Sequence, residues 1–263
     1  MSRVQAPSIA HMTDIHAFFL GLVQGITEFF PVSSSTHLYF IKKILGLDQT
    51  ASMISFDLFC HLGTMAAACL FFRKEIFRIF SSLRTLALFS IALFPLIPAY
   101  FLFKPLRETL AGASPLFLIL TSLILFLASS SKKEARPQEG KSSPKWRDVL
   151  CIGVAQSFAL LPGVSRSGST ISVARLLGWP WEEAVRFSFL LAIPAIFGGT
   201  ALEVLRFDEV QIPWRACGVG FAVSFLAGIG ALQLLFRWLS PRLMRAFAWY
   251  CLTIGIISFL ILK

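Results

Sequence analysis

Two segments of this chain, 132 residues apart, share an unusual pattern in which an apolar run ends at a proline and a cluster of serines. They cover residues 21–37 and 153–170. Interrupted apolar segments at corresponding positions of two halves are the best sequence indication of the binding site in a membrane protein. Five positions are identical at this offset: Gly21 and Gly153, Gln24 and Gln156, Val32 and Val164, Ser33 and Ser165, and Ser35 and Ser167.

Long apolar runs also favour a membrane protein. Hydrophobic residues make up 56% of the chain, against about 45–50% in an average soluble protein. A helix needs about 20 apolar residues to cross a bilayer. We expect six membrane-spanning helices, at about residues 53–72, 85–103, 115–131, 187–205, 216–236 and 246–262.

The repeated segments form a different kind of element. Their apolar parts, at about 15–30 and 149–161, are short and end in proline and serine. Broken backbone at membrane depth persists only where protein buries it or where it lines a wet cavity. The predicted fold class is therefore an all-α polytopic membrane protein with about six transmembrane helices and two re-entrant helical hairpins. We expect one integral membrane domain over residues 1–263.

The lysines and arginines predict the orientation of these helices. Four loops carry 15 of the 24 cationic residues, the opposite side carries 8, and the last one is Arg166 inside the second repeated segment. By the positive-inside rule, the four loops face the cytoplasm and both chain ends lie outside. These loops are residues 73–84, 132–147, 175–186 and 237–245.

This orientation makes the two halves, about residues 1–131 and 149–263, an inverted repeat joined by a polar cytoplasmic linker at 132–148. The binding site of an inverted repeat lies near the bilayer midplane, where we expect the two hairpin tips to meet. The loops account for most of the net charge of +10. We therefore expect no nucleic-acid partner, although the loops would contact anionic membrane lipids.

The first repeated segment places a carboxylate among apolar residues. Gln24 and Glu28 are four residues apart and share one face of a helix. A carboxylate costs several kcal/mol in such a setting unless it is paired, hydrated or bound to a metal. Glu28 is therefore predicted to be a general base or a divalent-metal ligand, and the sequence does not separate these roles. The alternative is a glutamate at the outer headgroups.

His37 and the serine cluster follow Glu28 closely. Histidine suits proton transfer near neutral pH, so we expect Glu28 and His37 to converge on a reacting group. A purely structural histidine is the alternative. Of the serines, Ser34 is the predicted nucleophile, and helix capping is the alternative that we expect for at least one of Ser33, Ser34 and Ser35.

The second repeated segment carries a permanent positive charge, Arg166, between Gly163 and Gly168. Glycines let backbone N–H groups approach a ligand closely. Together with Ser165 and Ser167, the guanidinium would form a cradle for an anion such as phosphate. The alternative is that Arg166 only pairs with Glu28, which would be costly to maintain without a function.

A carboxylate, an imidazole, hydroxyls and a guanidinium at one place in the bilayer are the groups that phosphoryl transfer requires. The apolar surroundings would accept a lipid tail. The sequence therefore predicts a membrane-embedded phosphatase acting on a lipid phosphate or diphosphate. The alternative is a transporter or flippase of a polyprenyl phosphate lipid, since inverted repeats with broken helices are common in transporters.

These motifs resemble the undecaprenyl-diphosphate phosphatase family, also called the bacitracin-resistance family, over nearly the whole chain. Its two signatures stand here as Gln24-x-x-x-Glu28-Phe-Phe-Pro31-Val32-Ser33-Ser34-x-x-His37 and Pro162-Gly163-Val-Ser165-Arg166-Ser167-Gly-Ser-Thr170. The resemblance implies hydrolysis of undecaprenyl diphosphate to undecaprenyl phosphate and inorganic phosphate. That reaction recycles the carrier lipid for peptidoglycan synthesis and gives bacitracin resistance.

The resemblance also implies roles for single residues. Glu28, Ser34, His37 and Arg166 would be catalytic. The substrate-binding residues would be Gln24, Ser33, Gly163, Ser165, Ser167 and Thr170. The family implies a place in the bacterial plasma (inner) membrane with the active site open to the periplasm.

Divalent cations, Mg²⁺ or Ca²⁺, are the cofactors that the resemblance implies, with Glu28 as the candidate metal ligand. Position 24 is Gln where many relatives have Glu, so this element lacks the second carboxylate of a metal clamp. That departure weakens the metal site and shifts acid–base work to Glu28 and His37. The sequence leaves the oligomeric state open, a homodimer included.

Overall fold

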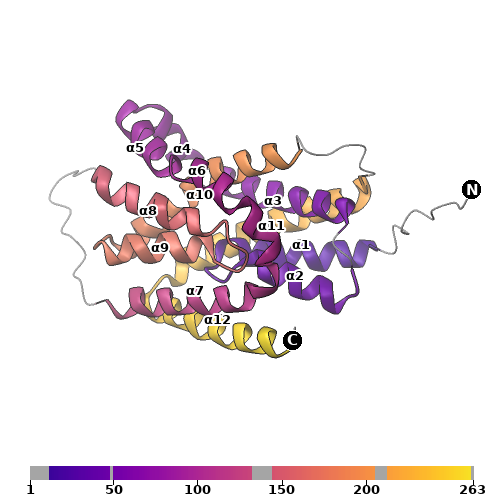
Figure 1. Ribbon diagram of the computed structural model, residues 1–263. Coiled ribbons are helices and arrows are strands. Elements are labelled where there is room, and N and C mark those ends of the chain that lie inside the picture. Colours follow the sequence, from indigo (N-terminus) through magenta and orange to yellow (C-terminus); the bar gives the residue numbers. More distant parts are fainter. Residues whose placement is uncertain (1–11, 48–49, 132–143, 205–211, 262–263) are drawn as a thin grey trace, which may run out of the picture.

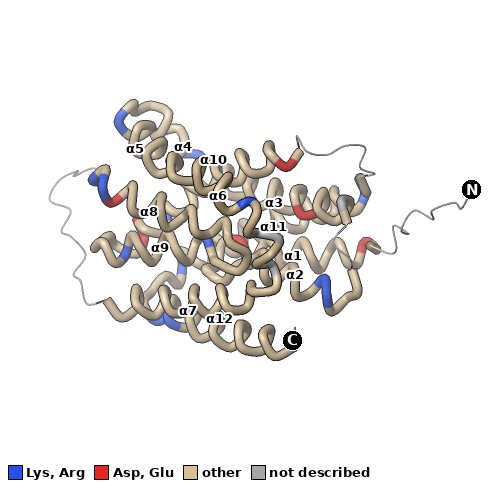
Figure 2. Tube along the Cα trace, viewed as in Figure 1, with Lys and Arg blue, Asp and Glu red and all other residues tan. Residues whose placement is uncertain are grey.

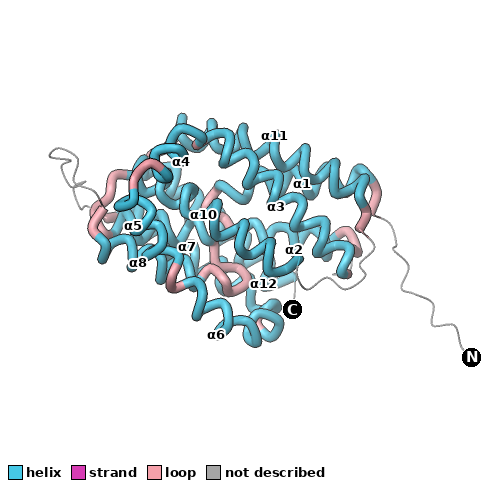
Figure 3. Tube along the Cα trace, turned by 90° about the horizontal axis from the view of Figure 1, so that it is seen from above, coloured by secondary structure: helices cyan, strands magenta, loops and turns pink. Residues whose placement is uncertain are grey.

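The computed structural model describes residues 12–47, 50–131, 144–204 and 212–261, and these segments form helices without any β-strand (Figures 1 and 3). The all-α fold class is therefore confirmed. The helices are α1 (Asp14–Phe29), α2 (Ser34–Ile44), α3 (Ala51–Phe71), α4 (Arg73–Phe80), α5 (Leu83–Leu93), α6 (Leu96–Thr109), α7 (Ser114–Ser130), α8 (Trp146–Phe158), α9 (Arg166–Leu176), α10 (Trp181–Val204), α11 (Trp214–Trp238) and α12 (Pro241–Ile261). A short 3₁₀ turn, Ala111–Ala113, precedes α7.

Each of the six predicted spans falls largely on apolar helix, and residues 205 and 262 of two of them lie outside the described residues. Five stretches are long and apolar enough to cross a membrane: Ser52–Phe71, Leu83–Leu106, Trp181–Val204, Trp214–Trp238 and Pro241–Ile261. The sixth, Ser114–Ser130, is a shorter apolar helix. The protein is thus a multi-pass membrane protein, as the apolar runs predicted.

Three local details differ from the predictions. The span expected at 85–103 lies within Leu83–Leu106, which is long and apolar enough to cross a membrane, but this stretch is divided into α5 and α6 at Phe94 and Pro95, where the proline lacks the N–H that a continuous helix needs. The cytoplasmic loop expected at 73–84 contains α4. The linker expected at 132–148 ends earlier, because α8 begins at Trp146; its residues 132–143 lie outside the described residues.

Both repeated segments form helical hairpins. α1 and α2 are joined by the four residues 30–33, and α8 and α9 by the longer loop 159–165. In Figure 1 the first hairpin lies on the right of the bundle and the second on the left, and their loops face each other near the centre. α1 begins on the same side of the molecule on which α12 ends (Figure 1). Lys and Arg lie mainly near helix ends, with a few charges near the centre (Figure 2).

Small residues bring the hairpins close to their neighbouring helices. α1 packs along α11, and a Cβ on Gly25 would come within 2.6 Å of the Ala227 Cβ. A Cβ on Gly153 of α8 would likewise collide with the Ala92 carbonyl of α5. Close backbone approach through small residues is the usual way in which helices associate in membranes. Gly25 and Gly153 therefore bring the two hairpins into close contact with α11 and α5.

Candidate active site

The two hairpin loops meet around one pocket of about 260 Å³, which we call the tip pocket. Ligand sites usually occupy about 300–1,000 Å³, so the tip pocket has room for a headgroup rather than for a whole lipid. It combines a polar side with an apolar side. The polar side is Thr27, Glu28, Ser33, Ser34, Ser35, His61, Gln156, Ser165, Arg166 and Ser167, and the apolar side is Leu96, Ala159, Leu160, Val164, Ala195 and Ile196.

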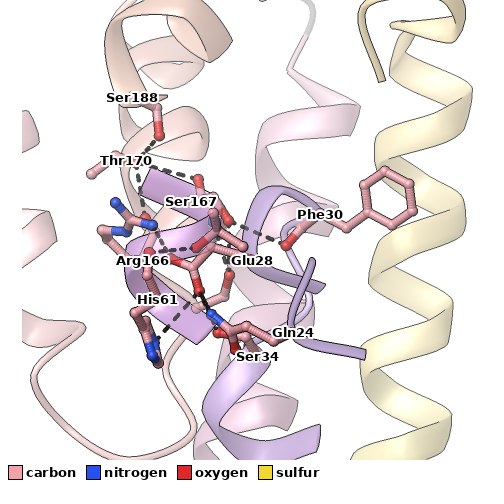
Figure 4. A network of polar contacts seen from close by, with 12 residues as sticks. Gln24, Glu28, Phe30, Ser34, His61, Arg166, Ser167, Thr170 and Ser188 are labelled. Atoms are coloured by element: carbon pink, nitrogen blue, oxygen red, sulfur yellow. Dashed lines mark hydrogen bonds and ion pairs between the residues drawn. The ribbon is translucent and has the colours of Figure 1, made fainter. Parts of the chain in front are cut away.

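Glu28, in the last turn of α1, is the centre of the polar side (Figure 4). Its Oε1 accepts a hydrogen bond from Arg166 Nη2 at 2.5 Å, although the two residues are 138 positions apart. Its Oε2 accepts from the Ser34 hydroxyl at 2.7 Å and from Gln24 Nε2 at 2.9 Å. The carboxylate is buried and fully engaged. The structural ion pair that was our alternative for Arg166 is therefore present.

The ion pair does not use all the polar atoms at the pocket. Arg166 Nη1 is buried and has no hydrogen-bond partner among the described residues, and the same is true of both amide atoms of Gln156. Buried polar groups are normally paired, and an unpaired donor costs about 1–3 kcal/mol. Unused buried donors beside a pocket indicate a ligand that accepts hydrogen bonds.

The loop of the first hairpin is strained at one residue. Ser33 has φ 64° and ψ 90°, and it is the one non-glycine residue with positive φ in the described segments. Such backbone costs about 1–3 kcal/mol and is typical of functional sites. Ser33 precedes α2, yet its side chain does not cap the helix; its Oγ lies 3.1 Å from Thr36 Oγ1. Side-chain capping, expected for at least one of Ser33, Ser34 and Ser35, is thus not observed at the N-cap residue Ser33, and Ser34 contacts Glu28.

The second hairpin has a relaxed loop. Ser165 is the N-cap of α9 with φ −73°, and its Oγ accepts the Gly168 N–H at 3.1 Å. Its own N–H donates to Thr121 Oγ1 of α7 at 3.0 Å. Gly163 has φ 101° and no room for a side chain beside the Ser114 backbone. Gly163 is absent from the lining of the tip pocket, so its place in the structure is explained by packing against α7.

Two helix N-termini therefore face one pocket. α2 begins at Ser34 and α9 begins at Arg166, and both residues line the tip pocket. The first N–H groups of a helix have no intrahelical partner and carry about half a positive charge. A helix N-terminus is a ready site for an anion such as phosphate. With Arg166 lining the same pocket, the arrangement favours a phosphate group.

His37 does not lie where the sequence placed it. Its Nδ1 is 2.8 Å from the Ser33 carbonyl oxygen and its Nε2 is 2.8 Å from the Tyr250 hydroxyl. It is buried and is absent from the lining of the tip pocket. In this structure His37 does not face the tip pocket with Glu28, because the turn at Ser33 directs the imidazole toward α12, and its catalytic role stays a prediction.

Two other predicted site residues support the pocket from outside. Thr170 is buried, and its hydroxyl contacts the Ser188 hydroxyl of α10 at 2.5 Å and the Arg166 carbonyl at 2.9 Å. Gln24 donates to Glu28 without lining the pocket. Of the predicted residues, those that line the tip pocket are Glu28, Ser33, Ser34, Ser165, Arg166 and Ser167.

The imidazole in the tip pocket belongs to His61 of α3, which our sequence analysis did not single out. Its Nε2 lies 3.8 Å from Glu28 Oε2, and its Nδ1 is 2.8 Å from the Asp57 carbonyl. A carbonyl only accepts, so Nδ1 carries the proton and the neutral ring presents its lone pair to the pocket. The available signal was an ionisable residue inside a predicted span, which is a functional-site hypothesis by default.

The side chains of the pocket do not make a metal site by themselves. Glu28 is its one carboxylate, and both oxygens are engaged with Arg166, Ser34 and Gln24. In the described parts of the chain, no group of three or more His, Cys, Asp or Glu side chains could hold a metal ion. A Mg²⁺ or Ca²⁺ ion prefers several oxygen ligands, so Glu28 as a metal ligand stays a prediction that this donor set does not favour.

The fold and the pocket define a polytopic, all-helical membrane protein with a charged site between two hairpin tips. The sequence model of the family described as bacitracin resistance protein BacA matches residues 17–257. The chain therefore belongs to the bacitracin resistance protein BacA family.

Curated relatives agree with this assignment. A protein of Protochlamydia amoebophila named undecaprenyl-diphosphatase is 42% identical over 253 residues, which cover 93% of this chain and 97% of that protein. Undecaprenyl-diphosphatases of Syntrophotalea carbinolica and Carboxydothermus hydrogenoformans are both 37% identical, and each alignment covers 93% of this chain and at least 96% of the relative. The family resemblance inferred from the two motifs is confirmed.

Proposed function

We propose that this protein is an undecaprenyl-diphosphate phosphatase, which hydrolyses undecaprenyl diphosphate to undecaprenyl phosphate and inorganic phosphate. The observation that carries the proposal is the tip pocket, where Glu28, Ser34 and Arg166 meet between two helix N-termini. The relatives named above carry the name of this activity. The product would re-enter peptidoglycan synthesis as the carrier lipid, and its recycling would give bacitracin resistance.

The terminal phosphate of the substrate would lie between the N-termini of α2 and α9. Arg166 offers Nη1, which has no partner among the described residues, and the helix ends offer backbone N–H groups. A phosphate that also attracts Arg166 Nη2 would weaken its hydrogen bond to Glu28. Glu28 would then become a stronger base, because the opposite charge that stabilised its ionised form is shared with the substrate.

Ser34 is the nucleophile in this proposal. Its hydroxyl already donates to Glu28 at 2.7 Å, which is the hydrogen bond that a serine and its base require. The Ser34 Oγ–phosphorus bond forms as the bond from phosphorus to the bridging oxygen breaks, and the serine proton moves to Glu28. Undecaprenyl phosphate leaves. Water then bonds to phosphorus, Ser34 Oγ leaves with the proton from Glu28, and inorganic phosphate is released.

His61 places a second proton acceptor beside this pair. Its Nε2 is 3.8 Å from Glu28 Oε2 and carries the lone pair of the neutral ring. It would accept a proton from Glu28 or from the attacking water. His37 takes no part in these transfers, because its ring is directed toward Tyr250.

The apolar side of the pocket supports a lipid substrate. Leu96 of α6, Leu160 of the second hairpin loop and Ile196 of α10 face the same space as the charged groups. A pocket of about 260 Å³ holds a headgroup, so the prenyl chain would run from this apolar side into the bilayer. A lipid diphosphate fits both sides of the pocket, because its phosphates would bind the charged groups and its prenyl chain would contact the apolar residues.

We further propose that the protein resides in the bacterial plasma (inner) membrane with the tip pocket open to the periplasm. The halves 1–131 and 149–263 would then have opposite orientations, as the cationic loops predict. Labelling of single cysteines placed in α4 and at the start of α1 tests the orientation. A homodimer also stays a prediction, which light scattering in detergent would test.

The test of the proposed activity is release of inorganic phosphate from a C15 or C55 prenyl diphosphate by the purified protein in detergent. Each assay is run with Mg²⁺, with Ca²⁺ and with chelator. Glu28→Gln and Arg166→Ala should each lower turnover by about 10²–10³-fold, as expected when one preorganised charge is removed. Glu182→Gln and Arg78→Ala, whose side chains lie outside the pocket, serve as matched controls.

Lack of phosphate release from folded wild-type protein under every metal condition would overturn the proposal. Transport of a polyprenyl phosphate lipid would then become the leading alternative, since it needs the arginine and the apolar side but no nucleophile. The names of the relatives do not favour that alternative. Release that requires a cation would support the predicted Mg²⁺ or Ca²⁺ dependence.

A further inference from the structure

The strained loop of the first hairpin is held by the last helix of the chain. The Phe30 and Phe247 rings pack with their centroids 5.0 Å apart, and Figure 4 shows the Phe30 ring directed away from the polar network toward α12. The Cys251 thiol lies 3.5 Å from the Pro31 carbonyl oxygen. Val32 is buried in a cluster with α7 and α12. One face of α12 therefore contacts three consecutive residues of this loop.

The fourth loop residue, Ser33, is connected to α12 through His37. His37 Nδ1 is 2.8 Å from the Ser33 carbonyl oxygen, which can only accept, so Nδ1 carries the proton. In the neutral ring Nε2 is then an acceptor, and the Tyr250 hydroxyl, 2.8 Å away, donates to it. The two rings are nearly parallel, at 6°, with centroids 5.6 Å apart. The Ser33 carbonyl thus determines the tautomer, and Tyr250 holds the orientation of the imidazole by donating to Nε2.

This chain of contacts ends at the proposed nucleophile. The carbonyl that His37 holds belongs to the peptide group between Ser33 and Ser34. Ser33 is the residue with φ 64°, a conformation that persists only where its surroundings hold it. A rotation of this peptide would move the Ser34 hydroxyl away from Glu28, its partner at 2.7 Å.

We infer that Tyr250 is a positioning residue, which acts through His37 to hold the Ser33 peptide and so to aim Ser34 at the phosphorus atom. The inference rests on the proposed phosphatase function. Neither Tyr250 nor His37 lines the tip pocket. His37 accordingly connects α12 to the loop of the first hairpin. The last helix of the second half thus helps to position the reactive groups of that hairpin.

Tyr250→Phe removes only the hydroxyl and keeps the ring that stacks on His37. We expect kcat for a C15 prenyl diphosphate to fall about 10-fold while KM changes less than 2-fold, because Arg166 and the α9 N-terminus, which bind the phosphate, are untouched. Tyr39→Phe, a hydroxyl removed from α2 outside the pocket, is the matched control and should leave both constants unchanged. An unchanged kcat in Tyr250→Phe would overturn the inference.

A double-mutant cycle tests whether Tyr250 acts through His37. In a His37→Gln background, Tyr250→Phe should cause no further loss of kcat. Equal losses in both backgrounds would mean that Tyr250 acts by another route and would overturn the inference.

A spectroscopic measurement keeps the test independent of activity. In protein labelled with ¹⁵N-histidine, His37 is identified by the signals that vanish in His37→Gln. The wild type should show the tautomer with the proton on Nδ1, and Tyr250→Phe should shift the Nε2 signal to that of a ring nitrogen without this hydrogen bond. An Nδ1 without a proton in the wild type would overturn the inference. Wild-type protein that releases no phosphate would count against the proposed function alone, since the tautomer does not depend on turnover.

Discussion

The two hairpins share a sequence pattern but divide the work of the pocket between them. The first carries the carboxylate Glu28 and the hydroxyl of Ser34, and its loop is strained at Ser33. The second carries Arg166 behind a relaxed N-cap at Ser165. Identical serines at 33 and 165 thus occupy opposite backbone conformations, with φ 64° and −73°. Both copies of a duplicated segment can thus keep the helical-hairpin structure, while one copy carries the reactive groups and the other carries the positive charge.

The hairpins are also held in corresponding ways by each other's halves. The first loop contacts α12 through Phe247 and Cys251. The second loop contacts α7 through Thr121. α7 and α12 in turn pack against each other. The last helix of each half therefore supports the hairpin of the other half, which couples the two loops across the pocket.

The sharpest test of this division compares two serines. Ser34→Ala should lower turnover by about 10³-fold, because it removes the proposed nucleophile that donates to Glu28. Ser167→Ala removes a 3.3 Å hydrogen bond to the Phe30 carbonyl, which is worth about 1 kcal/mol, or less than 10-fold. Phosphate release from a C15 prenyl diphosphate measures both. Similar losses in the two variants would mean that water, rather than Ser34, attacks phosphorus.

His61 of α3 is proposed to act together with the reactive groups of the first hairpin. His61→Asn should reduce turnover by about 10²-fold, the usual effect of losing a group that transfers protons. Its Nε2 faces Glu28 and lines the pocket. Single-turnover assays of His61→Asn, with His16→Asn outside the pocket as control, provide the measurement. Full activity in His61→Asn would restrict proton transfer to Glu28.

The smallest effect concerns the backbone of the two loops. Ser33→Gly should raise stability by up to about 1 kcal/mol, since glycine adopts positive φ without strain. Ser165→Gly should lower stability by a few tenths of a kcal/mol, because it removes a side-chain cap at ordinary φ. Thermal unfolding in detergent would then shift by a few degrees at most, upward for the first variant and downward for the second. Shifts of the same sign would contradict the proposed strain at Ser33.

Much of the architecture could be predicted because it depends on local pattern. Six apolar runs of about 20 residues became six apolar helical stretches, since a bilayer requires that length. The repeated serine clusters predicted both hairpins and the meeting of Glu28 with Arg166. The break at Phe94 and Pro95 was missed because apolar composition alone does not separate one long helix from two.

Site residues were predicted less evenly. Glu28, Ser34 and Arg166 were found because charged and hydroxyl groups are costly among apolar residues and so stand out. The direction of the His37 ring did not follow from its nearness to Glu28 in sequence, because the turn at Ser33 directs the ring to α12. His61 and Gln156 were missed, although one is an ionisable group in a span and the other repeats Gln24.

The sequence by itself determined that the chain enters a membrane, that it contains two broken hairpins, and that a carboxylate, serines and an arginine lie on them. Those conclusions follow from hydrophobicity and from the cost of burying polar groups, which act locally along the chain. Only the tertiary structure decided which imidazole faces the pocket and which supports the loop. That choice depends on the packing of α3 and α12 against hairpins far away in sequence, and no local pattern encodes the direction in which a side chain crosses between helices.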